Sequence, residues 1–239
     1  MPMSQGMTSG VLAAWAIVFF IFAGSAVVSY FLGCFNGSVI VSKYILKDDV
    51  RNHGSGNAGL TNFHRTFGGK LTAVVLALDI LKMVLAVFIS MLMPSIVLGI
   101  YVGVVHFWDY LPATWMLGLK YWAGMWCLLG HMFPCTFGFK GGKGILSGVT
   151  LLFLIDWRMG LISLALFVVI VALTRYISLG SICATASFPV TTFLFVSREP
   201  VLLVLSVLLA ALIIWMHRGN IKRLLEGTEN KFSLHRKEK

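Results

Sequence analysis

The sequence predicts an all-α integral membrane protein with about seven transmembrane helices. Of its 239 residues, 58% are hydrophobic and 12% are charged, and the mean hydropathy is +0.89. Soluble domains carry about 25% charged residues, so this composition lies outside their range. Apolar runs long enough to cross about 30 Å of hydrocarbon as helices recur along the chain. We therefore expect residues 1–239 to form a single multi-span membrane domain, with a short basic tail from about residue 217.

The first predicted span covers residues 11–33. No charged residue precedes Lys43, and the run lacks both the basic segment and the Ala-x-Ala cleavage site of a removable signal peptide. We expect it to remain as a membrane anchor. Glycine, proline and charged residues separate the other predicted spans, which cover 71–93, a stretch within 112–133, 144–156, 160–174, 177–197 and 200–216.

The region 94–133 is ambiguous, because Pro94, Asp109 and Pro112 interrupt a long apolar tract. It can hold one span with an external or re-entrant piece, or two full spans. A single span gives the better topology, since the polar segments 47–70, 134–143 and 174–178 and the tail after 217 then share one side of the membrane. These segments would form one site.

The distribution of charge favours the same topology. Of 19 Lys and Arg residues, all except Lys82, Lys120, Arg158 and Arg198 fall on the shared side. Because Lys and Arg concentrate in short cytoplasmic loops, the N-terminus should lie outside and the C-terminus in the cytoplasm. The net charge of +10 then describes one basic face, which suits anionic lipid head groups or an anionic substrate.

Several other kinds of site are disfavoured by missing patterns. The basic residues lie in short loops without a nucleic-acid recognition motif, so we expect no nucleic-acid partner. The six histidines form neither H-E-x-x-H nor another ligand spacing, which predicts no metal. The four cysteines show no C-x-x-C pair, and no G-x-S-x-G element occurs. We expect neither a cofactor nor an obligate protein partner.

Two glycine-rich segments are suited to binding phosphate. In the run from Gly54 to Gly59, glycine allows positive φ and close backbone approach, so successive N–H groups can face one anion. The sequence KGGKG at 140–144 precedes an apolar helix, whose N-terminus offers free N–H donors. Either segment alone is also typical of an ordinary turn. Their shared side, together with Arg51, Arg65 and Lys143, favours phosphate binding.

Five strings give the chain a family resemblance: GSGNAGLTN, LDILK, GHMFP followed by FKGGKG, RYISLGSI and HRGNIKRLLEGTEN. In this order, from about residue 37 to 230, they resemble the motifs of the PlsY family, the bacterial membrane acyl phosphate:glycerol-3-phosphate acyltransferases. The resemblance implies transfer of a fatty acyl group from acyl phosphate to the 1-hydroxyl of glycerol 3-phosphate, giving lysophosphatidic acid and inorganic phosphate. It also implies seven spans in the bacterial cytoplasmic membrane, contact with membrane lipids and a cytoplasmic site.

The resemblance also implies site residues by their position in the motifs. The first motif supplies phosphate and polar contacts from Ser38, Arg51, Ser55, Gly56, Asn57 and Asn62. The second motif supplies Lys140, Gly141, Gly142 and Lys143, of which Lys143 is the main cation. In the alternative interpretation, Lys143 only extends its ammonium group toward the membrane interface, as lysines at helix ends commonly do. Ser178 and Ser181 either donate hydrogen bonds to phosphate or satisfy a helix start.

The last motif carries His217 and Asn220. His217 is the best titratable candidate for the base that removes the hydroxyl proton. In the alternative, a substrate phosphate accepts the proton, and His217 and Asn220 bind glycerol 3-phosphate. Together with Lys143 and Arg51, these two residues form the predicted catalytic set. Glu226, Glu229 and Asn230 are expected to help fold the tail over the site.

Two features within the motif strings are expected to be structural. Asp79 and Lys82 lie three residues apart on a predicted helix, so they can pair and offset the cost of charge inside the membrane. His131 ends a predicted span, where histidine commonly caps helix carbonyls or orders a loop.

The chain departs from the usual family pattern at Val39, Ile40, Met83 and Gly219, which suggests a divergent member.

Two alternatives to the acyltransferase remain. One is a transporter or channel for an organic phosphate, which would place polar groups near the bilayer midplane and repeat its architecture internally. No convincing inverted repeat is present, and the polar motifs gather at one end of the predicted spans. The other alternative is a non-catalytic paralogue that binds lipid phosphates.

Overall fold

The computed structural model describes residues 2–102 and 112–232, with side chains for 12–100 and 112–232. The described residues form helices and no strands, as an all-α fold requires. Seven helices occupy the places of the predicted spans: α1 (Pro2–Cys34), α4 (Leu71–Val102), α5 (Ala113–Met132), α6 (Ile145–Ile155), α7 (Trp157–Thr174), α8 (Ile177–Phe195) and α9 (Pro200–Met216).

Three short helices lie between or after these seven: α2 (Gly37–Ile40), α3 (Leu60–Thr66) and α10 (Arg218–Leu225). A π-helical turn (Val41–Ile45) follows α2, and 3₁₀ turns cover Val50–Asn52 and Cys135–Phe137. The tail predicted from about residue 217 begins with α10. Residues 103–111, which include Asp109, and residues 233–239 lie outside the described part of the chain.

The seven helices differ in whether they are long and apolar enough to span a membrane. Four of them are long and apolar enough to cross a membrane, or five when α9 and α10, which are bent by 59°, count as one broken span. Helix α6 has 11 residues, and at about 1.5 Å per residue it covers roughly half of the hydrocarbon thickness. These helices support the integral membrane class, with four or five spans by length and composition in the described residues.

Pro94 does not end a helix, in contrast to its predicted role as an interruption. Helix α4 continues through Pro94 as far as Val102. A proline inside a membrane helix removes one backbone hydrogen bond, and neighbouring groups and local adjustments of the helix compensate. The first half of the ambiguous region therefore extends the second apolar helix by nine residues beyond the expected end at 93.

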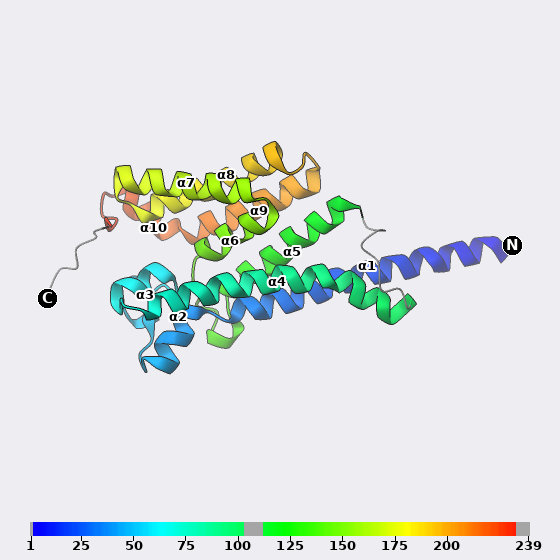
Figure 1. Cartoon of the computed structure of the whole chain (residues 1–239), viewed down its shortest axis with the longest axis horizontal. Coiled ribbons are helices and arrows are strands. Elements are labelled where there is room, and N and C mark those ends of the chain that lie inside the picture. The colour runs from blue at the N-terminus through cyan, green and yellow to red at the C-terminus, as the bar shows by residue number, and fades with distance from the viewer. Residues whose placement is uncertain (1, 103–111, 233–239) are drawn as a thin grey trace.

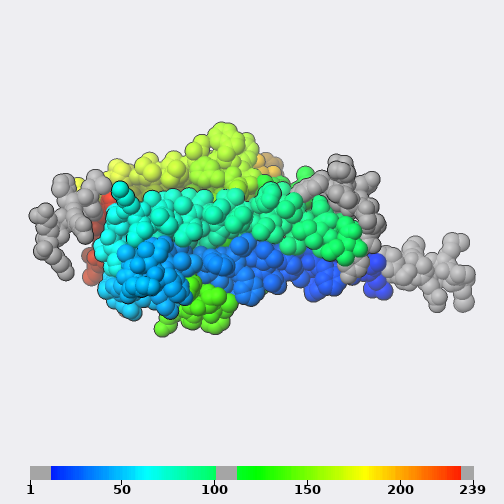
Figure 2. All heavy atoms as spheres, turned by 60° about the horizontal axis from the view of Figure 1, so that its bottom comes forward, coloured from blue at the N-terminus to red at the C-terminus, as the bar shows by residue number. Residues whose placement is uncertain are grey.

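The helices pack as two groups that meet along their length. Helices α1, α4 and α5 form one group, and α6, α7, α8 and α9 form the other (Figure 1). In the space-filling view α1 and α4 run side by side (Figure 2). Glycines allow α1 and α5 to approach closely, because a Cβ atom on Gly130 would collide with the backbone oxygen of Tyr30. The buried core between the groups includes Met83, Tyr121, Leu151 and Leu209.

The polar motifs gather at one end of this bundle. Helices α2, α3 and α10 lie together there, opposite the end at which α1 begins (Figure 1). Along the bundle, large apolar side chains such as Phe19, Val168, Leu173 and Val204 are exposed, as expected for a surface that faces lipid. The fold thus brings loops that are distant in sequence to one place.

Candidate functional site

A cavity of about 840 Å³ opens at the end of the bundle where the polar motifs meet. Its polar part is lined by residues from all four segments that the sequence analysis placed on one side, including Ser55, Lys143, Ser178 and Asn220. Its apolar part lies among α6, α7, α8 and α9, where the lining includes Leu152, Leu164, Phe167, Phe188 and Ile213. The cavity therefore joins a polar compartment to an apolar one.

The first polar loop is held in shape by Asn62. Its Nδ2 atom donates to the backbone oxygens of Val50, His53 and Asn57, each at 3.0 Å, and its Oδ1 atom accepts from the Ser55 N–H at 3.1 Å. With all of these bonds made inside the loop, Asn62 acts mainly as a framework residue, although it borders the cavity. Ser55 and Asn57 lie on the cavity wall.

Gly54 has a positive φ of 56° that this loop requires. A Cβ atom there would also collide with Oδ1 of Asn62.

The second polar loop turns back along the end of α5. The N–H groups of Gly141 and Gly142 donate to the oxygens of Met132 and His131, both at 3.1 Å. Glycine is needed where the loop passes the end of α5, since a Cβ atom on Gly142 would collide with the His131 ring and the Ala58 oxygen. Gly144, with φ of 79°, directly precedes the first residue of α6. This path carries Lys143 into the bundle and onto the cavity wall.

Hydrogen bonds connect the second loop, α8, α10 and the tail in one network. Lys143 Nζ donates to Oδ1 of Asn220. Asn220 Nδ2 donates to Oε1 of Glu229 at 2.7 Å, and Ser178 Oγ donates to the same oxygen at 2.8 Å. The second carboxylate oxygen of Glu229, Oε2, accepts a hydrogen bond from Arg223 Nε at 2.7 Å. Glu229 therefore ties three separate segments together, in agreement with its expected role in folding the tail over the site.

The charges of this network shift two pKa values. The pKa of Lys143 is lowered to about 8, mainly by burial and also by nearby Arg223 and Arg65, against the opposing effect of Glu229. For Glu229, burial acts to raise the pKa, but hydrogen bonds from Asn220, Ser178 and Arg223 outweigh it and lower the pKa overall. At neutral pH the site thus holds an ammonium group beside a carboxylate, with further cations around them.

His217 is buried at the cavity wall, and its neighbours select one tautomer. Nδ1 lies 2.8 Å from the Ile213 oxygen. A carbonyl oxygen can only accept, so Nδ1 carries the proton in the neutral ring and Nε2 presents a lone pair. His217 can therefore accept a proton or a hydrogen bond at Nε2. Ser181 also borders the cavity, but its hydroxyl donates to the Ile177 oxygen within α8.

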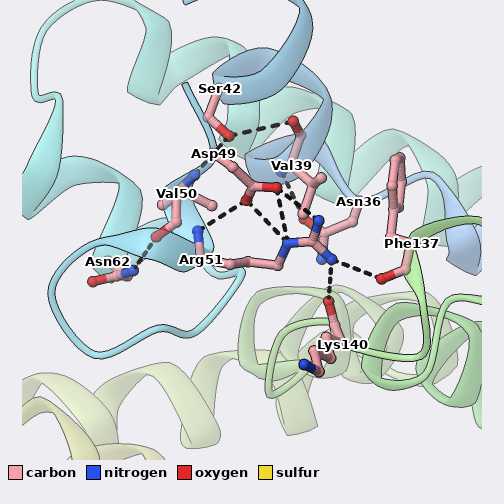
Figure 3. A network of polar contacts seen from close by, with 9 residues as sticks. All are labelled: Asn36, Val39, Ser42, Asp49, Val50, Arg51, Asn62, Phe137 and Lys140. Carbon is pink, nitrogen blue, oxygen red and sulfur yellow. Dashed lines mark hydrogen bonds and ion pairs between the residues drawn. The ribbon is translucent and has the colours of Figure 1, made fainter. Parts of the chain in front are cut away.

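Arg51 lies outside the cavity lining and braces the two polar loops instead (Figure 3). Its Nε and Nη2 atoms bond Asp49, and Nη1 donates to the backbone oxygens of Phe137 and Lys140 at 2.7 and 3.3 Å. The hydrogen bonds from Arg51 lower the pKa of Asp49. The guanidinium therefore directs most of its N–H groups at protein acceptors, and the expected direct contact between Arg51 and a bound phosphate stays a prediction.

Other expected contacts are also displaced from the cavity. Ser38 is fully buried in α2, and its hydroxyl has no hydrogen-bond partner among the described residues. Lys140 is exposed on the outer part of its loop. The predicted site residues that do not line the cavity are Ser38, Arg51, Gly56, Lys140, Gly141 and Gly142, whereas Ser55, Asn57, Asn62, Lys143, Ser178, Ser181, His217 and Asn220 do.

The cavity wall also includes residues that the sequence analysis left without a place in the site. Arg65 was recognised as a nearby cation, while Arg223 and Ser147 were not singled out. Arg223 lies within the HRGNIKRLLEGTEN string, but its orientation depends on how the tail folds back. Within residues 2–102 and 112–232, no group of three or more His, Cys, Asp and Glu side chains is arranged to hold a metal ion.

Comparison with known proteins identifies relatives over most of the chain. A family model described as glycerol-3-phosphate acyltransferase matches residues 23–227. Proteins of that name from Thermoanaerobacter pseudethanolicus and Clostridioides difficile are 39% and 38% identical over 207 and 206 residues. The matches cover 87% and 86% of this chain, respectively, and 93% of each relative.

Solved structures are similar as well. The glycerol 3-phosphate form of PlsY (YgiH), an integral membrane glycerol 3-phosphate acyltransferase, matches with a TM-score of 0.69 and 32% identity over 89% of this chain and 96% of that one. Its lysophosphatidic acid form gives a TM-score of 0.66 and 34% identity, covering 89% and 95% of the two chains.

The network around Glu229 predicts how firmly the tail is held. Changing Glu229 to Ala removes the acceptor for Ser178, Asn220 and Arg223, and hydrogen bonds to a charged group contribute about 1.5–3 kcal/mol each. We expect trypsin to cleave the tail after Arg223 or Lys231 at least about tenfold faster in Glu229→Ala. Timed digestion followed by mass spectrometry measures the rates. Glu226→Ala is the matched control, because Glu226 is exposed and lies 3.8 Å from Lys222; equal cleavage of both variants would contradict the network.

Proposed function

The chain belongs to the glycerol-3-phosphate acyltransferase family, and we propose that it transfers a fatty acyl group from an acyl phosphate to the 1-hydroxyl of sn-glycerol 3-phosphate. The products are lysophosphatidic acid and inorganic phosphate. The observation that carries this proposal is the cavity itself, which combines a cationic polar end with an apolar end between helices. A reaction between a lipid-like donor and a small phosphorylated acceptor requires this combination.

The polar end suits two phosphorylated reactants. Lys143, Arg65 and Arg223 border it, and Glu229 bonds Arg223 directly and Lys143 through Asn220. Cations near a partly enclosed cavity attract phosphate more strongly than they would in bulk water, because the local dielectric constant is lower. Ser55, Asn57 and Asn220 add polar groups that can orient the phosphate and the glycerol hydroxyls.

The apolar end suits the acyl chain. Phe167, Phe188 and Leu164 are among the side chains that line it, and burial of each CH₂ group of a bound acyl chain contributes about 0.8 kcal/mol. An acyl chain in this position would place its activated carbonyl near Lys143 and Asn220, where the polar and apolar parts of the cavity join.

The proposed chemistry is a direct acyl transfer. The oxygen of the 1-hydroxyl forms a bond to the carbonyl carbon, and the bond from that carbon to the phosphate oxygen breaks with its electron pair on phosphate. The hydroxyl proton passes to Nε2 of His217, or to a phosphate oxygen while His217 only orients the hydroxyl. Lys143 stabilises the developing charge on the carbonyl or the leaving phosphate. Because the donor is already activated, positioning is the main task of the protein.

We also propose that the polar end faces the cytoplasm of a bacterial cell and that the N-terminus lies outside, with the chain embedded as one multi-span domain. The support is the excess of Lys and Arg at the polar end, which includes Arg65, Lys143, Lys222 and Arg223. A reporter active only in the cytoplasm, fused to the C-terminus, should be active. An inactive C-terminal fusion with an active N-terminal one would reverse the orientation.

The acyl donor is tested with purified protein in detergent or a lipid mesophase. With palmitoyl phosphate and glycerol 3-phosphate, we expect release of inorganic phosphate and formation of one equivalent of lysophosphatidic acid. Palmitoyl thioesters should give no product, because their carbonyl carbon bears a sulfur leaving group in place of the phosphate that the cationic end would hold. Turnover with a thioester alone would contradict the proposed donor. Flux of glycerol 3-phosphate into proteoliposomes without phosphate release would support a transporter instead.

The lowered pKa of Lys143 predicts the pH dependence of this activity. Below about pH 8 the side chain is an ammonium ion, and it loses its charge as the pH rises through that value. We expect kcat/KM for glycerol 3-phosphate to fall on the alkaline side with an apparent pKa near 8, since kcat/KM reports groups of the free enzyme. In Lys143→Arg, which stays charged, the residual activity should lose this alkaline limb.

The control for the pH experiment is Lys140, which lies in the same loop but is exposed outside the cavity. Lys143→Met should lower kcat/KM at least about tenfold, a loss of about 1.4 kcal/mol of transition-state stabilisation. Lys140→Met should change it less than about twofold, because solvent screens an exposed charge. An unchanged alkaline limb in Lys143→Arg would remove Lys143 from this role.

A further inference from the structure

A buried polar cluster lies where α4 meets the end of α5. It consists of Asp79, Lys82 and His131, whose exposed fractions are 2%, 4% and 3%. Lys82 Nζ lies 2.7 Å from Oδ1 of Asp79, 2.6 Å from Nδ1 of His131 and 3.3 Å from the Phe35 oxygen. The three hydrogens of the ammonium group thus have three acceptors. The ion pair agrees with the structural role predicted for Asp79 and Lys82 from their spacing.

This geometry decides which nitrogen of His131 carries a proton. An ammonium group has three donors and no acceptor, so the contact between Lys82 and Nδ1 requires Nδ1 to accept. A histidine whose Nδ1 accepts is the neutral tautomer with its proton on Nε2. Protonation of both nitrogens would place two positive groups 2.6 Å apart inside the protein. The ion pair with Asp79 holds Lys82 in this contact and so maintains the tautomer.

The Nε2 side of His131 faces the second polar loop. A Cβ atom on Gly142 would collide with Nε2, which places this nitrogen against the backbone just before Lys143. His131 also belongs to the cavity wall. In the described part of the chain, no hydrogen bond joins Nε2 to a protein group, although Nδ1 is fully engaged. An N–H donor without a protein partner therefore borders the cavity, where it is available to an acceptor that enters.

We propose that His131 is a substrate-contacting residue, whose Nε2–H donates a hydrogen bond to a phosphate oxygen of the reactant held beside Lys143, while Lys82 and Asp79 are positioning residues that fix its tautomer. The proposal rests on the proposed function for the identity of that reactant. It gives the LDILK segment a purpose beyond packing, because its Asp and Lys prepare a neutral donor inside a cationic site. A neutral imidazole can approach an anion there without adding to the repulsion among Lys143, Arg65 and Arg223.

The tautomer is tested directly by nitrogen NMR of the full-length protein labelled with ¹⁵N-histidine. His131→Gln identifies the His131 signals by their loss. We expect a protonated Nε2 and an unprotonated Nδ1 at pH 7, and a shift of the Nε2 signal when inorganic phosphate or glycerol 3-phosphate is added. His64 is the internal control, because it is exposed, bonds Thr72 and does not line the cavity. A protonated Nδ1, or an Nε2 signal unmoved at saturating concentrations of both ligands, would overturn the proposal.

Kinetics provides the second test. His131→Gln keeps an N–H donor near the same place, whereas His131→Leu has none. We expect kcat/KM to fall at least about tenfold more in the Leu variant than in the Gln variant, since a hydrogen bond to a charged group has this magnitude. Equal losses in two folded variants would assign His131 a packing role. If the Leu variant does not fold, or if acyl phosphate is not the donor, the NMR titration of the unaltered protein with inorganic phosphate still decides the proposal.

Discussion

The hydrogen-bond chain from Lys143 through Asn220 and Glu229 to Ser178 is the interaction on which the site depends. It joins a loop, two helices and the tail that the sequence separates by up to 86 residues, as counted from Lys143 to Glu229. The surrounding side chains are mainly cationic, so without the Glu229 carboxylate they would repel one another. With it, the cavity can remain assembled before any anion binds.

The short helix α6 and the glycines before it determine where Lys143 lies. The second loop runs back along α5 for two residues, and a Cβ atom at Gly142 would prevent this path. Helix α6 therefore begins inside the bundle and has only 11 residues. An incomplete span is thus a means of bringing a cation to the junction between the polar and apolar parts of the cavity. Arg51 holds the same loop from outside.

Much of the fold follows from local sequence patterns, and much of the site does not. The spans predicted at 160–174 and 200–216 agree closely with α7 and α9, because apolar runs and helix breakers are local signals. Pro94 was misleading, since apolar surroundings allow a helix to continue through proline. The gathering of the motifs at one end followed from counting spans. Which side chains reach the cavity could not be predicted, because Arg51 and Lys143 carry the same charge and differ only in the fold of their loops.

The most direct test of the site is a structure of the protein with glycerol 3-phosphate bound, determined in a lipid environment. We expect the phosphate inside the cavity, with at least one oxygen within hydrogen-bond distance of Lys143 Nζ and the glycerol hydroxyls toward Asn220. The network through Glu229 should remain in place. A phosphate bound instead at the outer face beside Arg51 and Lys140, with the cavity around Lys143 unchanged, would contradict the account.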